Sequence, residues 1–263
     1  MLSKVLKYDL KYMYKMLVIF YIFTLLFAGM TRLLWLFDGS AILHFIGDIT
    51  DIITICMMFG IIFYNVMRAW MRFWNNIYKD ESYLTHTLPI TKNTIYASKF
   101  LATCITLATS IAVIIIALLI AYYSKENMEL LKKSLDGLAE VYDSTAIGIL
   151  LTMFLVFFLE LLAAVLAGFT GLLLGQRSHT SKTVKSIILG FACYIGSSLI
   201  LLGIVFILGF FVKDIMNLFM TDTMPSVEII KPILLGAIGL YGLLVLIYYA
   251  IDMKIFKKGV NVD

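Results

Sequence analysis

The chain has 263 residues, of which 62% are hydrophobic and 14% are charged, and its mean hydropathy is +0.97. A soluble protein of this length cannot bury so much apolar surface. The composition therefore excludes a soluble protein and predicts an all-α integral membrane protein. The formal net charge of +4 gives no indication of a nucleic-acid partner. Spans of ~20 residues leave little room for a soluble domain, so we expect one membrane domain over residues 1–263.

Residues 1–15 have apolar side chains at helical spacing, and lysines recur on another side of the same helix: Lys4, Lys7, Lys11 and Lys15. This pattern predicts an amphipathic helix at the membrane surface that leads into the first span. A secretory signal peptide is the alternative interpretation of a basic start followed by an apolar run. The run continues past Ala28 without a small-residue cleavage pattern, which argues against a signal peptide.

Six apolar segments are predicted to cross the membrane as helices: 16–36, 50–70, 98–123, 146–175, 183–212 and 232–251. The fourth and fifth are about 30 residues each, more than a bilayer core of about 30 Å requires, so we expect them to tilt, project or bend. Six spans place both termini on one side. Most of the 21 lysines and arginines fall on that side, so the positive-inside rule predicts cytoplasmic termini.

The polar segment 124–144 separates the third and fourth spans and is predicted to form an amphipathic helix, weakened at Gly137. Its apolar residues recur at steps of three and four: Met128, Leu131, Leu135, Leu138 and Tyr142. Two placements of this helix stay open. It lies over the outer ends of the spans, or it pairs with the same helix of a second subunit.

No motif in the sequence indicates catalysis. There is neither an H-E-x-x-H motif nor a G-x-x-x-x-G-K-[ST] phosphate loop. Ser197 and Ser198 lie in a span without a histidine to act as base, so they are interpreted as small packing residues. The three cysteines fall in apolar runs, and their spacing matches no ligand pattern. We expect no catalytic residue, no metal site and no cofactor bound by this chain.

Glu160 is an ionisable residue near the middle of the long fourth span. A charged group at that depth costs about 2.5–3.5 kcal/mol on insertion scales, so Glu160 should face protein or water. One interpretation is an interhelical hydrogen bond, and the other is a group that lines a translocation path or carries protons. Small residues form a ladder beside it and predict a helix-packing face: Ala163, Ala167, Gly171 and Gly175.

The stretch 67–99 between the second and third spans is basic and aromatic. Its first half continues the second span, and its aromatic rings and arginines suit the membrane–water boundary. A short helix is then expected over Ser82–Leu88, because Pro89 stops it and Thr91 is placed to cap the next helix. The residues alone leave two interpretations of this short helix: an interfacial anchor without a partner, or a lever between two spans.

An acidic residue, a Leu-Pro pair and a Ser-Lys pair succeed one another before the third span: Asp80 and Glu81, Leu88 and Pro89, Ser98 and Lys99. This order resembles the cytoplasmic loop of permease subunits of bacterial type 2 ABC (ABC-2) exporters. A basic amphipathic segment, six spans and cytoplasmic ends also agree with that family over essentially the whole chain. Glu160 matches no motif of the family.

The resemblance implies a multi-pass permease of the bacterial plasma membrane, with an N-terminal elbow helix, that forms a dimer with a second permease copy. ATP and magnesium would bind to a separate ATPase subunit, which docks on a cytoplasmic coupling helix. The residues that would contact the ATPase are Asp80, Glu81, Tyr83, Leu84, His86, Leu88 and Pro89. The exported substrate would be hydrophobic or amphipathic, such as an antimicrobial peptide, and Ile215–Met220 would dip back into the outer leaflet.

Two functions of other classes remain as alternatives. The first is an ion-coupled secondary transporter that uses Glu160 as its proton site. The absence of a convincing inverted repeat between residues 1–123 and 146–263 counts against it. The second is a non-transporting membrane scaffold or immunity protein, which would bind partners without stimulating ATP turnover.

Overall fold

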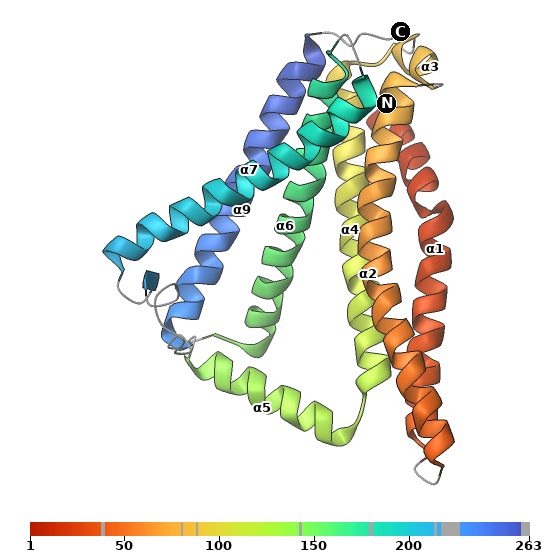
Figure 1. The fold of residues 1–263 in the computed structure, drawn as a ribbon, viewed down its shortest axis with the longest axis vertical. Coiled ribbons are helices and arrows are strands. Elements are labelled where there is room, and N and C mark those ends of the chain that lie inside the picture. The colour runs from red at the N-terminus through yellow and green to blue at the C-terminus, as the bar shows by residue number, and fades with distance from the viewer. Residues whose placement is uncertain are drawn as a thin grey trace. The chain divides into compact units, whose positions relative to one another are not determined.

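The computed structural model describes residues 1–37, 40–79, 81–87, 89–141, 144–178, 181–212, 215–216 and 227–258. Within these ranges all regular structure is helical (Figure 1): α1 (Leu2–Trp35), α2 (Ala41–Tyr78), α3 (Ser82–Thr87), α4 (Lys92–Tyr122), α5 (Lys125–Val141), α6 (Ala146–Gly175), α7 (Lys182–Phe211) and α9 (Val227–Lys257). Six of these helices are long and apolar enough to cross a membrane. The fold is therefore that of a multi-pass helical membrane protein.

The chain divides into two compact units, Met1–Leu130 and the remainder from Leu131 onward. The first unit contains α1 to α4, and the second contains α6, α7 and α9. The helix α5 carries the chain from one unit to the other. The expectation of one permease domain over the whole chain stays a prediction.

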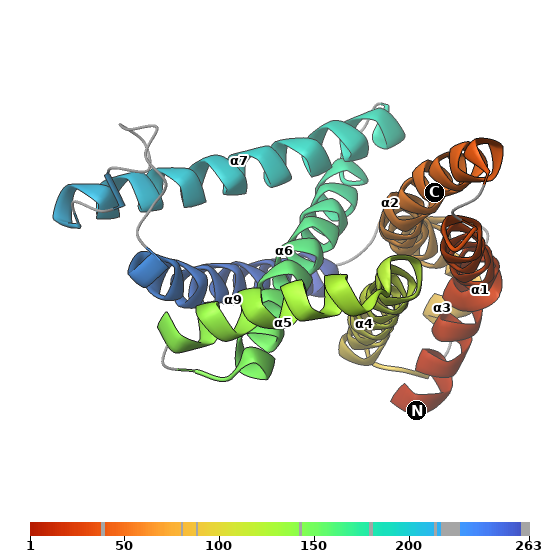
Figure 2. The same ribbon diagram turned by 90° about the horizontal axis from the view of Figure 1, so that it is seen from below.

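In the first unit, α1, α2 and α4 run side by side and contact one another in pairs (Figures 1 and 2). Apolar contacts fill the seam between them, as in the cluster of Leu17, Tyr21 and Ile61. Polar side chains in the same seam bond to one another. Asn65 Nδ2 donates to Ser110 Oγ at 2.7 Å, and the Tyr21 and Ser110 hydroxyls lie 2.8 Å apart. These buried polar groups thus find partners inside the bundle, as an apolar surrounding requires, whereas Arg68 Nε is buried without a hydrogen-bond partner.

The N-terminal segment forms one continuous helix with the first span, α1, rather than the separate elbow helix expected over residues 1–15. The physical reason is that neither proline nor glycine occurs before Gly29. Nothing in the backbone therefore favours a break at the point where the sequence changes from amphipathic to apolar.

The second span also extends beyond its predicted start, because α2 begins at Ala41 rather than at residue 50. The polar residues of this first part do not interrupt the helix, since neighbouring helices satisfy them. Trp35 Nε1 donates to Asp48 Oδ1 at 3.2 Å, and the Tyr122 hydroxyl donates to Asp51 Oδ1 at 2.6 Å. The predicted cap of the next span is confirmed, because the Thr91 hydroxyl accepts from the backbone N–H of Thr94.

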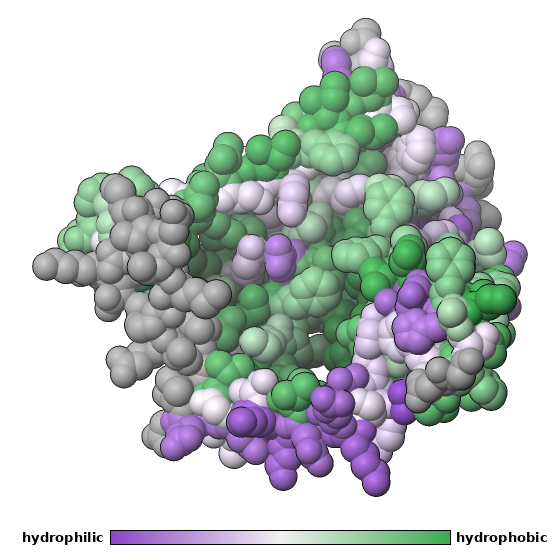
Figure 3. All heavy atoms as spheres, turned by 60° about the horizontal axis from the view of Figure 1, so that its bottom comes forward, coloured by the Kyte–Doolittle hydropathy of each residue, from purple (hydrophilic) through white to green (hydrophobic). Residues whose placement is uncertain are grey.

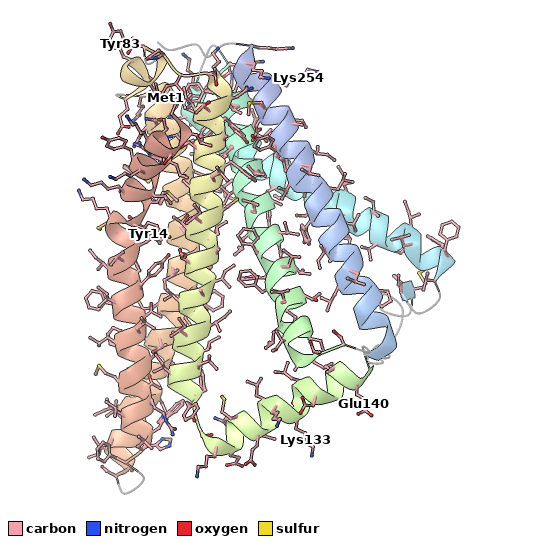
Figure 4. All side chains as sticks on the ribbon, turned by 180° about the vertical axis from the view of Figure 1, so that it is seen from behind. Met1, Tyr14, Tyr83, Lys133, Glu140 and Lys254 are labelled. Carbon is pink, nitrogen blue, oxygen red and sulfur yellow. The ribbon has the colours of Figure 1, made fainter. Side chains whose placement is uncertain are left out.

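The predicted amphipathic helix between the third and fourth spans is present as α5 and passes through Gly137 without a break. Its hydrophilic side chains form the purple band along the lower edge of Figure 3, and Figure 4 labels two of them, Lys133 and Glu140. Leu131 on its apolar side is 44% exposed. Whether α5 covers the span ends or pairs with a second copy stays a prediction.

In the second unit, α6 packs against α7 and α9. The fourth predicted span coincides with α6, and α9 begins at Val227, ahead of the predicted start at Pro232. The expected re-entrant segment Ile215–Met220 lies outside the described residues except for Ile215 and Met216.

Candidate functional site

A group of charged side chains lies inside the first unit, at the end that carries α3. Asp9 of α1 is completely buried there. It belongs to a ladder of residues four positions apart, Val5, Asp9, Met13 and Leu17, which places it on the side of α1 that contacts the bundle. A carboxylate buried away from water needs a counter-ion and hydrogen-bond donors. The neighbours of Asp9 provide both the counter-ion and the donors.

Asp9 is bound from two other helices. Arg72 Nε of α2 donates to Asp9 Oδ1 at 2.8 Å, and the Lys99 ammonium of α4 forms an ion pair with the same oxygen. The Ser98 hydroxyl donates to Asp9 Oδ2 at 2.5 Å. A single carboxylate therefore connects α1, α2 and α4 at this end of the unit.

Arg72 also connects this cluster to the residue that precedes α3. Its Nη1 donates to Glu81 Oε2 at 2.6 Å, and Asn76 Nδ2 donates to the same oxygen at 3.0 Å. Thr85 Oγ1 of α3 in turn donates to the backbone carbonyl of Glu81 at 2.9 Å. Two carboxylates and two cations thus form a chain with no net charge, from Lys99 through Asp9 and Arg72 to Glu81.

The arginines of α2 stack on α1 as well. The guanidinium carbons of Arg68 and Arg72 lie 3.8 Å and 4.7 Å from the centre of the Tyr12 ring, and Arg68 Nη2 donates to the Tyr12 carbonyl at 3.3 Å. Contacts of this kind are worth about 0.5–2 kcal/mol, depending on how far they are removed from water. They hold the N-terminal part of α1 against α2 in addition to the Asp9 ion pairs.

A pocket of about 390 Å³ opens beside the ion pairs, between the start of α1, α3 and the start of α4. Arg72, Glu81 and Lys99 lie along one part of it, and the rest is lined by both apolar side chains such as Val5 and polar ones such as Lys4. Glu81 is the least buried of the four charged residues, with 45% of its side chain exposed. The chain of ion pairs is therefore open to its surroundings at the end nearest α3.

The short helix α3 has a buried and an exposed side. Ser82 and Thr85 are buried, whereas Tyr83 is 75% exposed and Pro89 is also exposed. Figure 4 shows Tyr83 at the outer tip of this end of the unit, with Met1 nearby. Among the other predicted contact residues, Asp80 and Leu88 lie outside the described residues, as do the side chains of Leu84 and His86.

In the second unit, the predicted ladder of small residues on α6 is buried, and two of its members meet α7. A Cβ at Gly171 would overlap the backbone of Gly190, and one at Gly175 would overlap Ser186. Glu160 is half-buried and interacts electrostatically with Tyr241 of α9. Neither interpretation of Glu160 is tested by this arrangement, and both stay predictions.

Sequence reasoning missed two buried aspartates, Asp9 and Asp252. Asp252 of α9 is completely buried and accepts a hydrogen bond from the Thr170 hydroxyl of α6 at 2.6 Å. Both were detectable in principle. Each is an acidic residue within an otherwise apolar ladder, which signals a buried partner on another helix.

Fold and site together define a multi-pass helical membrane protein with a buried ion cluster beside a short helix that connects two of its long helices. Comparison of the sequence with protein-family models, with curated proteins and with solved structures finds no match.

Proposed function

We propose that this chain is the membrane subunit of an ATP-driven exporter of the type 2 ABC class, and that α3 is the coupling helix on which a separate ATPase subunit docks. The observation that carries this proposal is the set of connections and side-chain contacts that α3 makes. The short helix joins α2 to α4, presents Tyr83 outward, and is preceded by Glu81, which is bound to Arg72. An anchor without a partner needs no such connection to three long helices.

The mechanism follows from the ion pairs. ATP and magnesium would be held by two ATPase subunits, one docked on each copy of α3, and closure of these subunits would displace α3. Glu81 passes the displacement to Arg72, and Asp9 passes it on to Lys99, so that α1, α2 and α4 move as one body. Coupling through this contiguous set of short contacts requires no change in net charge within the membrane protein.

The proposal includes the arrangement that the resemblance implies. The chain forms a dimer in the bacterial plasma membrane with both termini in the cytoplasm, and α3 lies on the cytoplasmic side. The first part of α1 serves as the elbow, although it continues into the span without a break. The substrate is hydrophobic or amphipathic, such as an antimicrobial peptide, which suits spans whose outward surfaces are mostly apolar.

Co-purification tests the proposal most directly. The chain is expressed together with the ATPase encoded beside it and extracted in mild detergent. We expect the two proteins to elute as one complex whose ATP hydrolysis is stimulated by the membrane subunit. Elution of the chain alone, with the ATPase folded and active in the same extract, would contradict the exporter assignment.

A pair of tyrosine variants separates docking from general damage. Tyr83→Ala removes an exposed ring from α3, and we expect at least about a tenfold weaker association with the ATPase, as is typical for an aromatic anchor at an interface. Tyr123→Ala is the matched control, because Tyr123 is 59% exposed at the opposite end of α4. Equal losses in both variants would remove α3 from the interface.

Glu81→Lys tests the connection behind α3. The new cation lies beside Arg72, so the chain from Glu81 to Asp9 is broken by repulsion. We expect the variant to insert into the membrane. ATP hydrolysis by the ATPase bound to it should become independent of substrate. A variant that transports at the wild-type ratio of substrate to ATP would exclude Glu81 from coupling.

An ion-coupled transporter is the second candidate, because Glu160 is half-buried in an apolar helix and interacts with Tyr241. If the protein is an ion-coupled transporter, the chain alone should transport substrate in vesicles that carry a proton gradient. Glu160→Gln would abolish that transport. In the exporter, transport by vesicles containing the chain alone is absent with or without Glu160.

A further inference from the structure

The first four turns of α1 expose a row of lysines that we name the lysine face: Lys4, Lys7, Lys11 and Lys15. None of them has an ion-pair partner within the part of the chain that the structure describes. The single acidic residue of α1 is Asp9, which points the other way and is occupied by Arg72 and Lys99. The lysine face therefore carries positive charge without internal compensation.

The lysine face continues directly into the apolar outer surface of the same helix. Counting from Lys11, the exposed residues Lys15, Val18, Ile22 and Leu26 follow at steps of four, three, four and four. Residues at these steps lie on one side of a helix. Figure 4 shows nitrogen-tipped side chains projecting from the part of α1 near Met1, on the side away from α4.

The length of the apolar part of α1 places the lysine face at the membrane boundary. The segment Met16–Trp35 covers about 30 Å at 1.5 Å per residue, which matches the hydrocarbon core. The lysines begin where the core ends, and the headgroup layer adds about 5–8 Å on each side. Lys11 and Lys15 reach that layer, Lys7 lies within about one further Debye length of it, and Lys4 lies about one helical turn farther out.

We propose that the lysine face binds the phosphate groups of anionic phospholipids in the leaflet at the α3 end of the protein, and selects them over neutral lipids. Because the lysine face is positively charged, charge complementarity requires a negatively charged ligand. The unbroken row from the lysines to the lipid-facing residues indicates that this ligand is a lipid, because a lipid places a headgroup and acyl chains along one side of one helix. An acidic protein partner would find only the headgroup-level half of this surface. The proposal is independent of the exporter assignment.

The test measures which lipids the purified chain retains. Wild-type protein is placed in bilayer nanodiscs of phosphatidylcholine and phosphatidylglycerol in equal parts, transferred to mild detergent, and analysed for retained lipid by mass spectrometry. We expect phosphatidylglycerol to be enriched. In the variant with Lys4, Lys7, Lys11 and Lys15 all changed to Gln, the enrichment should fall by roughly fivefold or more, since each lysine near the surface contributes about that factor.

Two controls make the result specific. Arginine at the same four positions should keep the enrichment, because the charge is retained. Changing the exposed lysines of α5 to Gln should also keep it, because α5 mixes acidic and basic residues: Lys125, Lys132 and Lys133 are the positions to change.

Three outcomes would overturn the proposal. The first is no enrichment in the wild type, and the second is equal enrichment in the four-Gln variant. The third is a four-Gln variant that keeps its phosphatidylglycerol but loses a bound protein, which would assign the lysine face to a protein partner.

Discussion

Asp9→Asn is expected to lower the free energy of unfolding by roughly 3–5 kcal/mol, because removing one member of a buried ion pair leaves its partner charged and without a counter-ion. Here the residue left without a counter-ion is Lys99, whose side chain is 2% exposed, whereas Arg72 keeps its ion pair with Glu81. The amide of Asn keeps the size of the side chain and can still accept a hydrogen bond. Denaturation by increasing fractions of an ionic detergent in mixed micelles measures the loss.

A second variant separates charge from packing. In the double variant Asp9→Asn with Lys99→Met, the buried ammonium is gone, so we expect a smaller loss than in Asp9→Asn alone. Thr24→Val, at a completely buried threonine of the same helix, should cost about 1 kcal/mol because it removes one neutral hydrogen bond. If Asp9→Asn costs no more than Thr24→Val, the ion cluster does not hold the first unit together.

Gly171→Ala is expected to open the contact between α6 and α7. An added Cβ would overlap the backbone of Gly190 and lie 2.9 Å from the Ser186 carbonyl oxygen, and a helix backbone cannot move aside as a side chain can. Overpacking of this kind costs about 1–3 kcal/mol. The midpoint of thermal unfolding in detergent should fall accordingly.

Gly196→Ala is the matched control in α7, where an added Cβ would meet nothing within 4 Å. In that variant the change removes glycine's backbone entropy from a helix, which favours folding by about 0.5–1 kcal/mol. We therefore expect opposite signs for the two glycine variants. A Gly171→Ala protein at least as stable as Gly196→Ala would show that α6 and α7 are not in close contact.

Helix class, the six spans and the approximate ends of α4, α6 and α7 follow from local information in the sequence. A run of apolar residues needs no distant partner to become a helix in lipid, since each backbone group is satisfied within its own segment. The start of α2 did not follow in this way. Asp48 and Asp51 lie near the predicted start of the second span, and α2 continues through them because Trp35 and Tyr122 bind their carboxylates.

The residues alone predicted the short helix of the candidate site but not the contacts behind it. Tyr83 and Pro89 were assigned through the resemblance; both are exposed, and their contact with an ATPase stays a prediction. Ser98 and Lys99 entered only through a resemblance, and their common partner Asp9 was not identified from the sequence. A carboxylate in α1 and an ammonium in α4 are 90 residues apart in the chain, and no local periodicity reports that two such groups meet.

By itself, the sequence determined that this is a membrane protein of six apolar helices, that its fourth span carries a face of small residues, and that its N-terminal helix exposes lysines. These properties depend on composition and on spacing along one helix. Only the tertiary structure decided that Asp9, Arg72, Lys99 and Glu81 form one chain of ion pairs behind α3. Charges find partners through the packing of separate helices, and packing is set by side chains that are distant in sequence.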